Sequence, residues 1–295
     1  MRGAQAESRP ESGEPGTQEN AGSCPESGAR GEVLPLKPGE PKDDSRPESG
    51  APDAREDAPP KKGAQRFWEV LAREFWALAK LNLLYCACLF PSAALFLLGL
   101  FGFWNGLALL FVLPAAFPAG GAYSACVFCI AKMLRGDSGS VWHDFKRKWL
   151  ENVKQAILPG IIYTTFVYAQ AYLWSSWMLS GTFGSFPWLL LSFASLLVVG
   201  MTAPYFFLQV AYIDLKTAPI LKNTLLLSFS NAGRSLWGAS AGGAIWAAYF
   251  LFLPNALIFS PLVLLCGFSI PRLLTLMWVW PPVNRQFSIE EALRG

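Results

Sequence analysis

Long runs of apolar residues constrain the fold of this 295-residue chain more than any other feature of its sequence. Beyond residue 66, several stretches of about 19 or more residues are each long enough to cross a hydrocarbon layer of about 30 Å as an α-helix. A helix suits that layer because it pairs its own backbone N–H and C=O groups. The sequence therefore predicts an all-α fold, a polytopic membrane helix bundle. It argues against soluble enzymes, nucleic-acid-binding modules and secreted disulfide scaffolds.

About six transmembrane helices are expected, and proline and glycine interrupt several of them. The expected spans cover residues 81–101, 106–134, 156–178, 187–213 and, as two helices that split near residues 254–261, 235–281. Within the second span, Pro114, Pro118, Gly120 and Gly121 predict a helix that is either kinked or broken.

The first 65 residues differ sharply in composition from the rest of the chain. They hold no Trp, Phe or Tyr, carry 9 Lys or Arg against 13 Asp or Glu, and repeat Pro-Glu-Ser-Gly three times. A segment so poor in apolar side chains does not offset its ordering entropy by burial. We expect residues 1–65 to form a disordered cytoplasmic tail, residues 66–285 the transmembrane domain, and residues 286–295 a short cytoplasmic C-terminal tail.

Lys and Arg gather in three segments, 61–80, 132–154 and 214–234, and such segments stay on the cytoplasmic side of a membrane. Two cytoplasmic segments are separated by an even number of crossings, which favours two spans between residues 80 and 132. Residues 180–187 carry no charge and are expected to face outward. Six spans with both termini in the cytoplasm satisfy these conditions.

Two amphipathic helices are expected at the membrane surface, over residues 66–80 and within the 132–155 connection. In the connection, Trp142, Phe145 and Trp149 share one helical face. Its basic side chains are Lys146, Arg147, Lys148 and Lys154. These residues are interpreted either as a contact with anionic lipid at the cytoplasmic face or as a docking surface for a cytoplasmic partner.

The run RGDSGSVWHDFKRKWLENVKQA at residues 135–156 resembles the cytoplasmic connection of the YesL-like family of bacterial membrane proteins, whose pattern is rge…s…dFf…f..N.kqa. Residues 118–122 and 221–228 are similar to two further segments of that family. Lys146 departs from the pattern, because the family commonly has a second aromatic residue there. The resemblance covers residues 66–285 and implies a multi-pass protein of the bacterial cytoplasmic (inner) membrane. The family has no established activity, but its genes often lie beside carbohydrate-uptake transporters.

Polar side chains in the spans are candidates for lining a pathway. In the third span Thr164, Tyr168 and Tyr172 recur every four residues, and Gln170 lies on a neighbouring face. They are interpreted either as a polar cavity or as hydrogen-bonding groups between packed helices. Arg272 is the exceptional charge, and it lies near mid-membrane or at the inner interface, depending on where the last span begins.

No pattern typical of catalysis or metal binding is present. His143 is the only histidine and has Asp144 alone beside it, whereas metal sites need three or four ligands. Cys126 and Cys129 have C-x-x-C spacing inside an apolar helix, where cysteine behaves as a small hydrophobic residue. We therefore expect no catalytic residue, no metal and no cofactor.

Small residues form a stripe in the fifth span, Gly238-x-x-x-Gly242 beside Ala239-x-x-x-Gly243, which fits intramolecular packing and dimerisation equally. The oligomeric state stays open.

Two functions are carried forward. The first is a non-enzymatic accessory or regulatory component associated with carbohydrate uptake, with the lipid bilayer, anionic lipid and carbohydrate transporter subunits as partners and no nucleic acid. The alternative is a transporter in its own right, with a polar pathway lined by the second and third spans.

Overall fold

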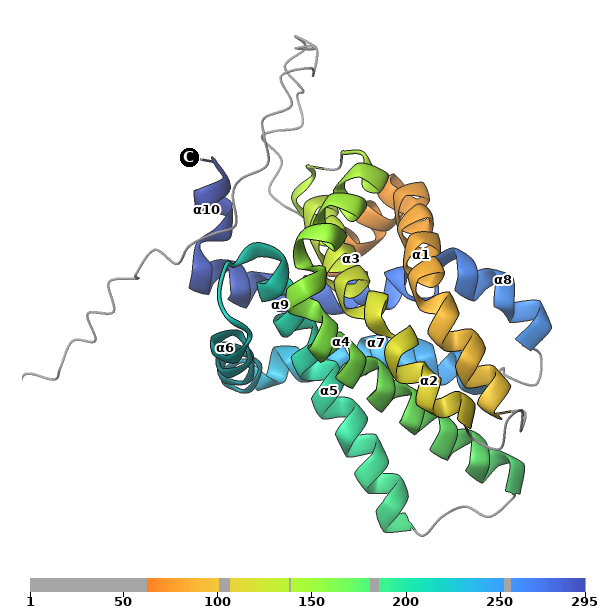
Figure 1. The fold of residues 1–295 in the computed structure, drawn as a ribbon. Coiled ribbons are helices and arrows are strands. Elements are labelled where there is room, and N and C mark those ends of the chain that lie inside the picture. The colour runs from red at the N-terminus through yellow and green to blue at the C-terminus, as the bar shows by residue number, and fades with distance from the viewer. Residues whose placement is uncertain (1–62, 101–106, 138, 181–185, 252–255, 295) are drawn as a thin grey trace, which may run out of the picture. The chain divides into compact units, whose positions relative to one another are not determined.

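The computed structural model describes residues 63–100, 107–137, 139–180, 186–251 and 256–294, and the regular elements over these ranges are α-helices (Figure 1). The helices are α1 (Ala64–Leu100), α2 (Leu107–Ala115), α3 (Phe117–Arg135), α4 (Val141–Ser180), α5 (Phe186–Tyr212), α6 (Thr217–Ser230), α7 (Ala232–Leu251), α8 (Ala256–Cys266), α9 (Ser269–Phe287) and α10 (Ile289–Arg294). The tail expected to be disordered lies outside the described residues, except for its last three.

Five helical stretches in the described part of the chain are long and apolar enough to cross a membrane. They are Ala64–Gly99, Phe111–Arg135, Val141–Ser175, Pro187–Tyr212 and Pro261–Phe287. The predicted all-α membrane bundle is thereby confirmed, and the count by length and composition is five where about six were expected.

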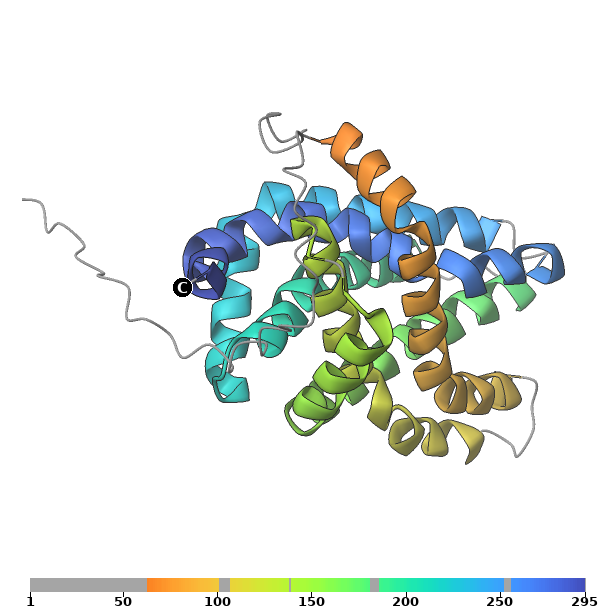
Figure 2. The same ribbon diagram turned by 90° about the horizontal axis from the view of Figure 1, so that it is seen from above.

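Helix α7 accounts for the difference, because it contains Gly and Ser residues together with Arg234. It packs on α9, and the two helices lie side by side in Figures 1 and 2. A Cβ on Gly238 would lie 3.4 Å from Thr275 O, and a Cβ on Gly242 would lie 3.4 Å from Pro271 O. Gly238 of α7 faces Thr275 of α9, and Gly242, further along α7, faces the earlier residue Pro271, so the two helices run antiparallel. Since α9 belongs to one of the five stretches, α7 runs antiparallel beside a helix that is long and apolar enough to cross a membrane.

The small-residue stripe of α7 serves contacts within the chain. Thr275 Oγ1 donates a hydrogen bond to Gly238 O at 3.0 Å, and Ala239 Cβ faces Gly200 of α5. Gly243 is exposed, and no atom of the described residues lies within 4 Å of the position that a Cβ would take there. Two helices therefore approach through Gly238 and Gly242 without a second copy of the chain.

Helix α3 lies at the centre of the bundle, since every residue from Ala119 to Leu134 is buried. The break expected in the second span falls at Ala116, between α2 and α3. Gly120 and Gly121, expected to contribute to that break, instead lie inside continuous α3. A Cβ on Gly120 would collide with the backbone of Ala156 and Gly160 in α4. These glycines let two helices touch.

Helix α4 is one continuous element of 40 residues. It joins the connection expected as a separate surface helix to the third span. Helix α1 similarly joins the other expected surface helix to the first span, with a kink at Glu74 (φ −109°, ψ 16°). The membrane-surface helices predicted over residues 66–80 and within the 132–155 connection are thus extensions of spanning helices that pack on α3.

The segments rich in Lys and Arg meet at one end of the bundle, which we call the charged end. Arg66 and Arg73 of α1 donate to Leu134 O at 2.8 Å and Met133 O at 3.0 Å in the last turn of α3. The guanidinium of Arg135 lies 5.8 Å from the Tyr212 ring at the end of α5. Between residues 66 and 134 the chain therefore leaves this end and returns, as the even number of crossings requires.

Candidate functional site

The last span is broken in its interior, between α8 and α9, and Asn82 of α1 bridges the break. Its Nδ2 donates to Val263 O at 2.9 Å and Leu264 O at 2.7 Å, and its Oδ1 accepts from the N–H groups of Phe268 at 2.8 Å and Ser269 at 3.0 Å. A helix end leaves such groups without partners, and hydrocarbon supplies none. One fully buried side chain thus satisfies both ends of the break.

Arg272 lies in the first turn of α9, directly after this break. Its guanidinium carbon is 3.7 Å from the ring centre of Tyr85 in α1 and 4.3 Å from that of Tyr123 in α3. Its Nη1 donates to Cys126 Sγ at 3.7 Å. Among the described residues, no carboxylate pairs with Arg272, and no carbonyl oxygen accepts from its guanidinium. We call Arg272, Tyr85, Tyr123 and Cys126 the Arg272 site.

Helix geometry sets the depth of the Arg272 site. The Trp280 ring lies 5.7 Å from the Arg135 guanidinium at the charged end. Arg272 precedes Trp280 by eight residues, or about 12 Å along a helix. Cys126 precedes Arg135 by nine residues of α3, or about 13 Å. Both distances place the site about 12–13 Å from the charged end along the helices.

Two cation–π contacts explain how the bundle tolerates this charge. An arginine at the centre of a spanning helix costs about 2.5–3.5 kcal/mol, and a desolvated cation–π contact contributes about 2 kcal/mol. The Tyr85 and Tyr123 rings, which stand at 82° to each other beside the Arg272 guanidinium, offset that cost. The N–H groups of the guanidinium also require hydrogen-bond acceptors.

Aromatic side chains from four helices and from the break between α8 and α9 surround the site. Tyr85 lies 5.2 Å from Phe268, and Tyr123 lies 5.3 Å from Tyr163 and 4.4 Å from Phe207, measured between ring centres. Sequence reasoning singled out Arg272 but missed these partners. A tyrosine inside an apolar run was the available signal, although the run does not reveal which neighbour its ring contacts.

The third-span residues expected to line a pathway separate onto two sides of α4. Thr164 is buried. Tyr168 faces α1, where its hydroxyl lies 3.1 Å from Ser92 Oγ and its ring stacks on Phe96. Gln170 faces α5 and donates to Ser195 Oγ at 3.1 Å. Tyr172, 43% exposed, completes the stripe. Tyr168 and Gln170 thus hydrogen-bond between packed helices, and none of the four residues makes a contact with Arg272 among those that the structure gives for it.

The basic residues of the connection divide into buried and exposed ones. Lys148 is buried, and its Nζ lies 2.8 Å from Glu151 Oε2. Arg147 lies 3.6 Å from Asp144 and 3.9 Å from Glu151. Asp144 also accepts from Lys132 Nζ at 2.9 Å, and both side chains are 8% exposed.

Lys146 and Lys154 are the members of the predicted basic surface that stay exposed.

The aromatic residues of the connection also differ in position. Phe145 is buried in the core, and the Trp149 indole donates to Pro118 O at 3.3 Å and packs where Gly121 leaves room. Trp142 instead points outward and is 62% exposed. Phe145 and Trp149 therefore seat α4 on α3, while Trp142 offers a surface.

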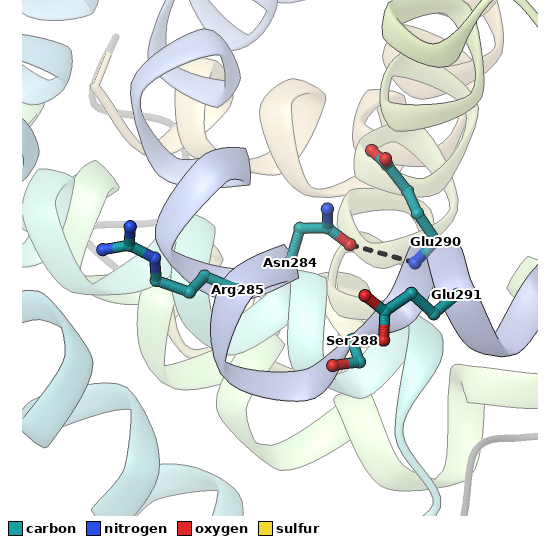
Figure 3. A pocket seen from close by; sticks show the side chains of 5 residues that line it. All are labelled: Asn284, Arg285, Ser288, Glu290 and Glu291. Carbon is teal, nitrogen blue, oxygen red and sulfur yellow. Dashed lines mark hydrogen bonds between the residues drawn. The ribbon is translucent and has the colours of Figure 1, made fainter.

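A polar hollow lies at the joint between α9 and α10 (Figure 3), lined by Asn284, Arg285, Ser288, Glu290 and Glu291. The N–H of Glu290 donates to Asn284 Oδ1 at 3.0 Å, and Glu290 Oε1 accepts from the Trp280 indole at 3.0 Å. In Figure 3 the Arg285 side chain points away from both glutamates. These contacts fix the turn at Ser288, which has φ 45°, so the hollow is part of a helix joint.

No group of three or more His, Cys, Asp or Glu side chains that could hold a metal ion occurs within the described ranges. His143 is exposed, while Cys126 and Cys129 are buried free thiols on α3.

Comparison of the chain with models of protein families, with curated proteins and with solved structures gives no significant match. The resemblance to the YesL-like family therefore stays an expectation from sequence.

Proposed function

We propose that this membrane protein is a transporter that binds a small solute at the Arg272 site, between α1, α3 and α9. One observation carries the proposal: a charged side chain without a carboxylate partner among the described residues lies beside a helix break, about 12 Å from the charged end. Ionisable residues at that depth mark substrate pathways, and interrupted helices form the binding sites of many transporters. The pathway expected from sequence was lined by the second and third spans. The proposed site keeps α3, from the second span, but uses α9 in place of the polar stripe of α4.

The proposed orientation places the charged end in the cytoplasm, because Lys and Arg are retained there. Both described ends of the bundle, at α1 and at α9, lie at the charged end. Reporter fusions after Gly63 and between residues 180 and 186 test this orientation. A cytoplasmic signal is expected at Gly63 and an external one at 180–186, and the reverse pattern would contradict it.

Water access to the Arg272 site tests the transport proposal. A variant that keeps Cys126 as its single cysteine is treated, in membrane vesicles, with a membrane-impermeant thiosulfonate reagent. The matched control keeps only Cys129, which lies three residues further along the same helix and is equally buried. A transporter must open the site to water, so Cys126 should react much faster than Cys129. Equal, slow reaction of both thiols would refute the proposal.

An accessory role in carbohydrate uptake is the second candidate, and the exposed part of α4 favours it. Trp142, Lys146 and Lys154 are exposed within the run that resembles the YesL-like family. Replacement of both lysines by Gln should abolish copurification of a transporter subunit without changing protein abundance. Retention of every captured partner would rule this docking surface out, leaving lipid contact as its role.

A further inference from the structure

We infer that the Arg272 site takes the carboxylate group of a small organic anion. This inference rests on the proposed function and names the chemical class of its solute. It follows from the partners that the Arg272 guanidinium has among the described residues, none of which is an anion.

The Arg272 site lacks an anionic partner for its guanidinium among the described residues. A guanidinium has five N–H donors along its edge. The rings of Tyr85 and Tyr123 lie 3.7 and 4.3 Å from its carbon and stand at 82° to each other. Its hydrogen-bond partners among the described residues are neutral: the side chains of Tyr85 and Tyr123 and the thiol of Cys126, which is a weak acceptor. A carboxylate presents two oxygens at the spacing of this fork and binds it through two parallel hydrogen bonds.

Charge and surroundings exclude the other occupants in turn. A neutral sugar would leave the positive charge uncompensated inside hydrocarbon. The N–H groups at the start of α9 already bind Asn82, so the site lacks the backbone donors that hold a phosphate at a helix start. A lipid headgroup would have to descend about 12 Å below the level of Trp280. Rings of Phe268, Phe207 and Tyr163 form the apolar surroundings that suit a short organic body.

Thermal unfolding of the purified full-length protein in lipid nanodiscs tests the inference. Sodium benzoate and sodium acetate are the carboxylate probes, with sodium chloride and sodium phosphate at equal ionic strength as comparison salts. A carboxylate that binds the folded state should raise the melting temperature saturably, whereas chloride and phosphate should not. The inference is overturned if neither carboxylate gives a saturable rise beyond the comparison salts.

Three substitutions locate the effect. Arg272→Gln should abolish the carboxylate-dependent rise, and Arg272→Lys should weaken it because an ammonium lacks the planar fork. Arg285→Gln is the matched control, since Arg285 is exposed on the same helix at the charged end. It should keep the full rise. Loss of the rise in Arg285→Gln, or its retention in Arg272→Gln, would place the anion elsewhere and contradict the inference.

A second measurement keeps native Arg272 and so does not depend on a variant of that residue folding. In the protein with Cys126 as its single cysteine, an anionic thiosulfonate should react about tenfold or more faster than a cationic one, because a local positive field raises the encounter rate of anions. Benzoate should slow both reactions. If Cys126 reacts fast but equally with the anionic and the cationic reagent, and benzoate does not slow either reaction, the carboxylate inference is overturned and the transport proposal stands. Unreactive Cys126 refutes transport, and the thermal shift still decides carboxylate binding.

Discussion

Replacement of Asn82 by Leu removes the bridge across the break between α8 and α9 and keeps the number and branching of the side-chain heavy atoms. Four hydrogen bonds are lost, two to carbonyl groups and two from N–H groups. At about 0.6 kcal/mol each, the average in a membrane bundle, the loss is about 2.4 kcal/mol. Buried groups left without partners cost about 1–3 kcal/mol each, so a break that does not relax raises the total above 4 kcal/mol. We expect the free energy of unfolding to fall by at least about 2 kcal/mol.

The assay is reversible unfolding of the purified protein in mixed detergent micelles, followed by tryptophan fluorescence. Asn231→Leu serves as the control, because Asn231 binds Leu227 O and Ser230 Oγ at the partly exposed end of α6. Its loss should cost less than about 1 kcal/mol. Equal stability of Asn82→Leu and Asn231→Leu would refute the role assigned to Asn82.

Two further predictions concern contacts of α3. Gly120→Ala should greatly reduce the amount of folded protein, because its Cβ collides with α4, whereas Gly243→Ala should be silent; fluorescence-detected gel filtration compares them. Lys132→Ala should lower the free energy of unfolding by about 3–5 kcal/mol, because it leaves Asp144 buried without Lys132. The double variant Lys132→Met with Asp144→Leu should recover most of that loss in the same unfolding assay. A Lys132→Ala variant as stable as the unmodified protein would contradict the stabilising role of the buried pair.

The sequence predicted the elements of this fold better than their continuity. Apolar run length and proline spacing located the spans and the break before α3. The joining of residues 141–155 to the third span was not predicted, because a basic amphipathic run looks the same on a membrane surface and on a neighbouring helix. Close approach of Gly120 to Gly160 decides between them, and that contact depends on packing.

The candidate site was predicted in one residue only. Arg272 was visible as the exceptional charge within the spans expected from sequence. Asn82 lies more than 180 positions away from the α8–α9 break that it bridges. No local pattern joins residues at that separation, so the tyrosine pair and the asparagine bridge emerged only from the packed bundle.

Uptake of radiolabelled benzoate into proteoliposomes tests most directly that Arg272 is the binding group of a transporter. Liposomes with the unmodified protein should take up the label saturably and exchange it against unlabelled benzoate, whereas liposomes with Arg272→Gln should match empty liposomes. Arg285→Gln should transport like the unmodified protein. Uptake by the unmodified protein no faster than by empty liposomes, or unchanged uptake in Arg272→Gln, would show that Arg272 is not the binding group of a benzoate transporter.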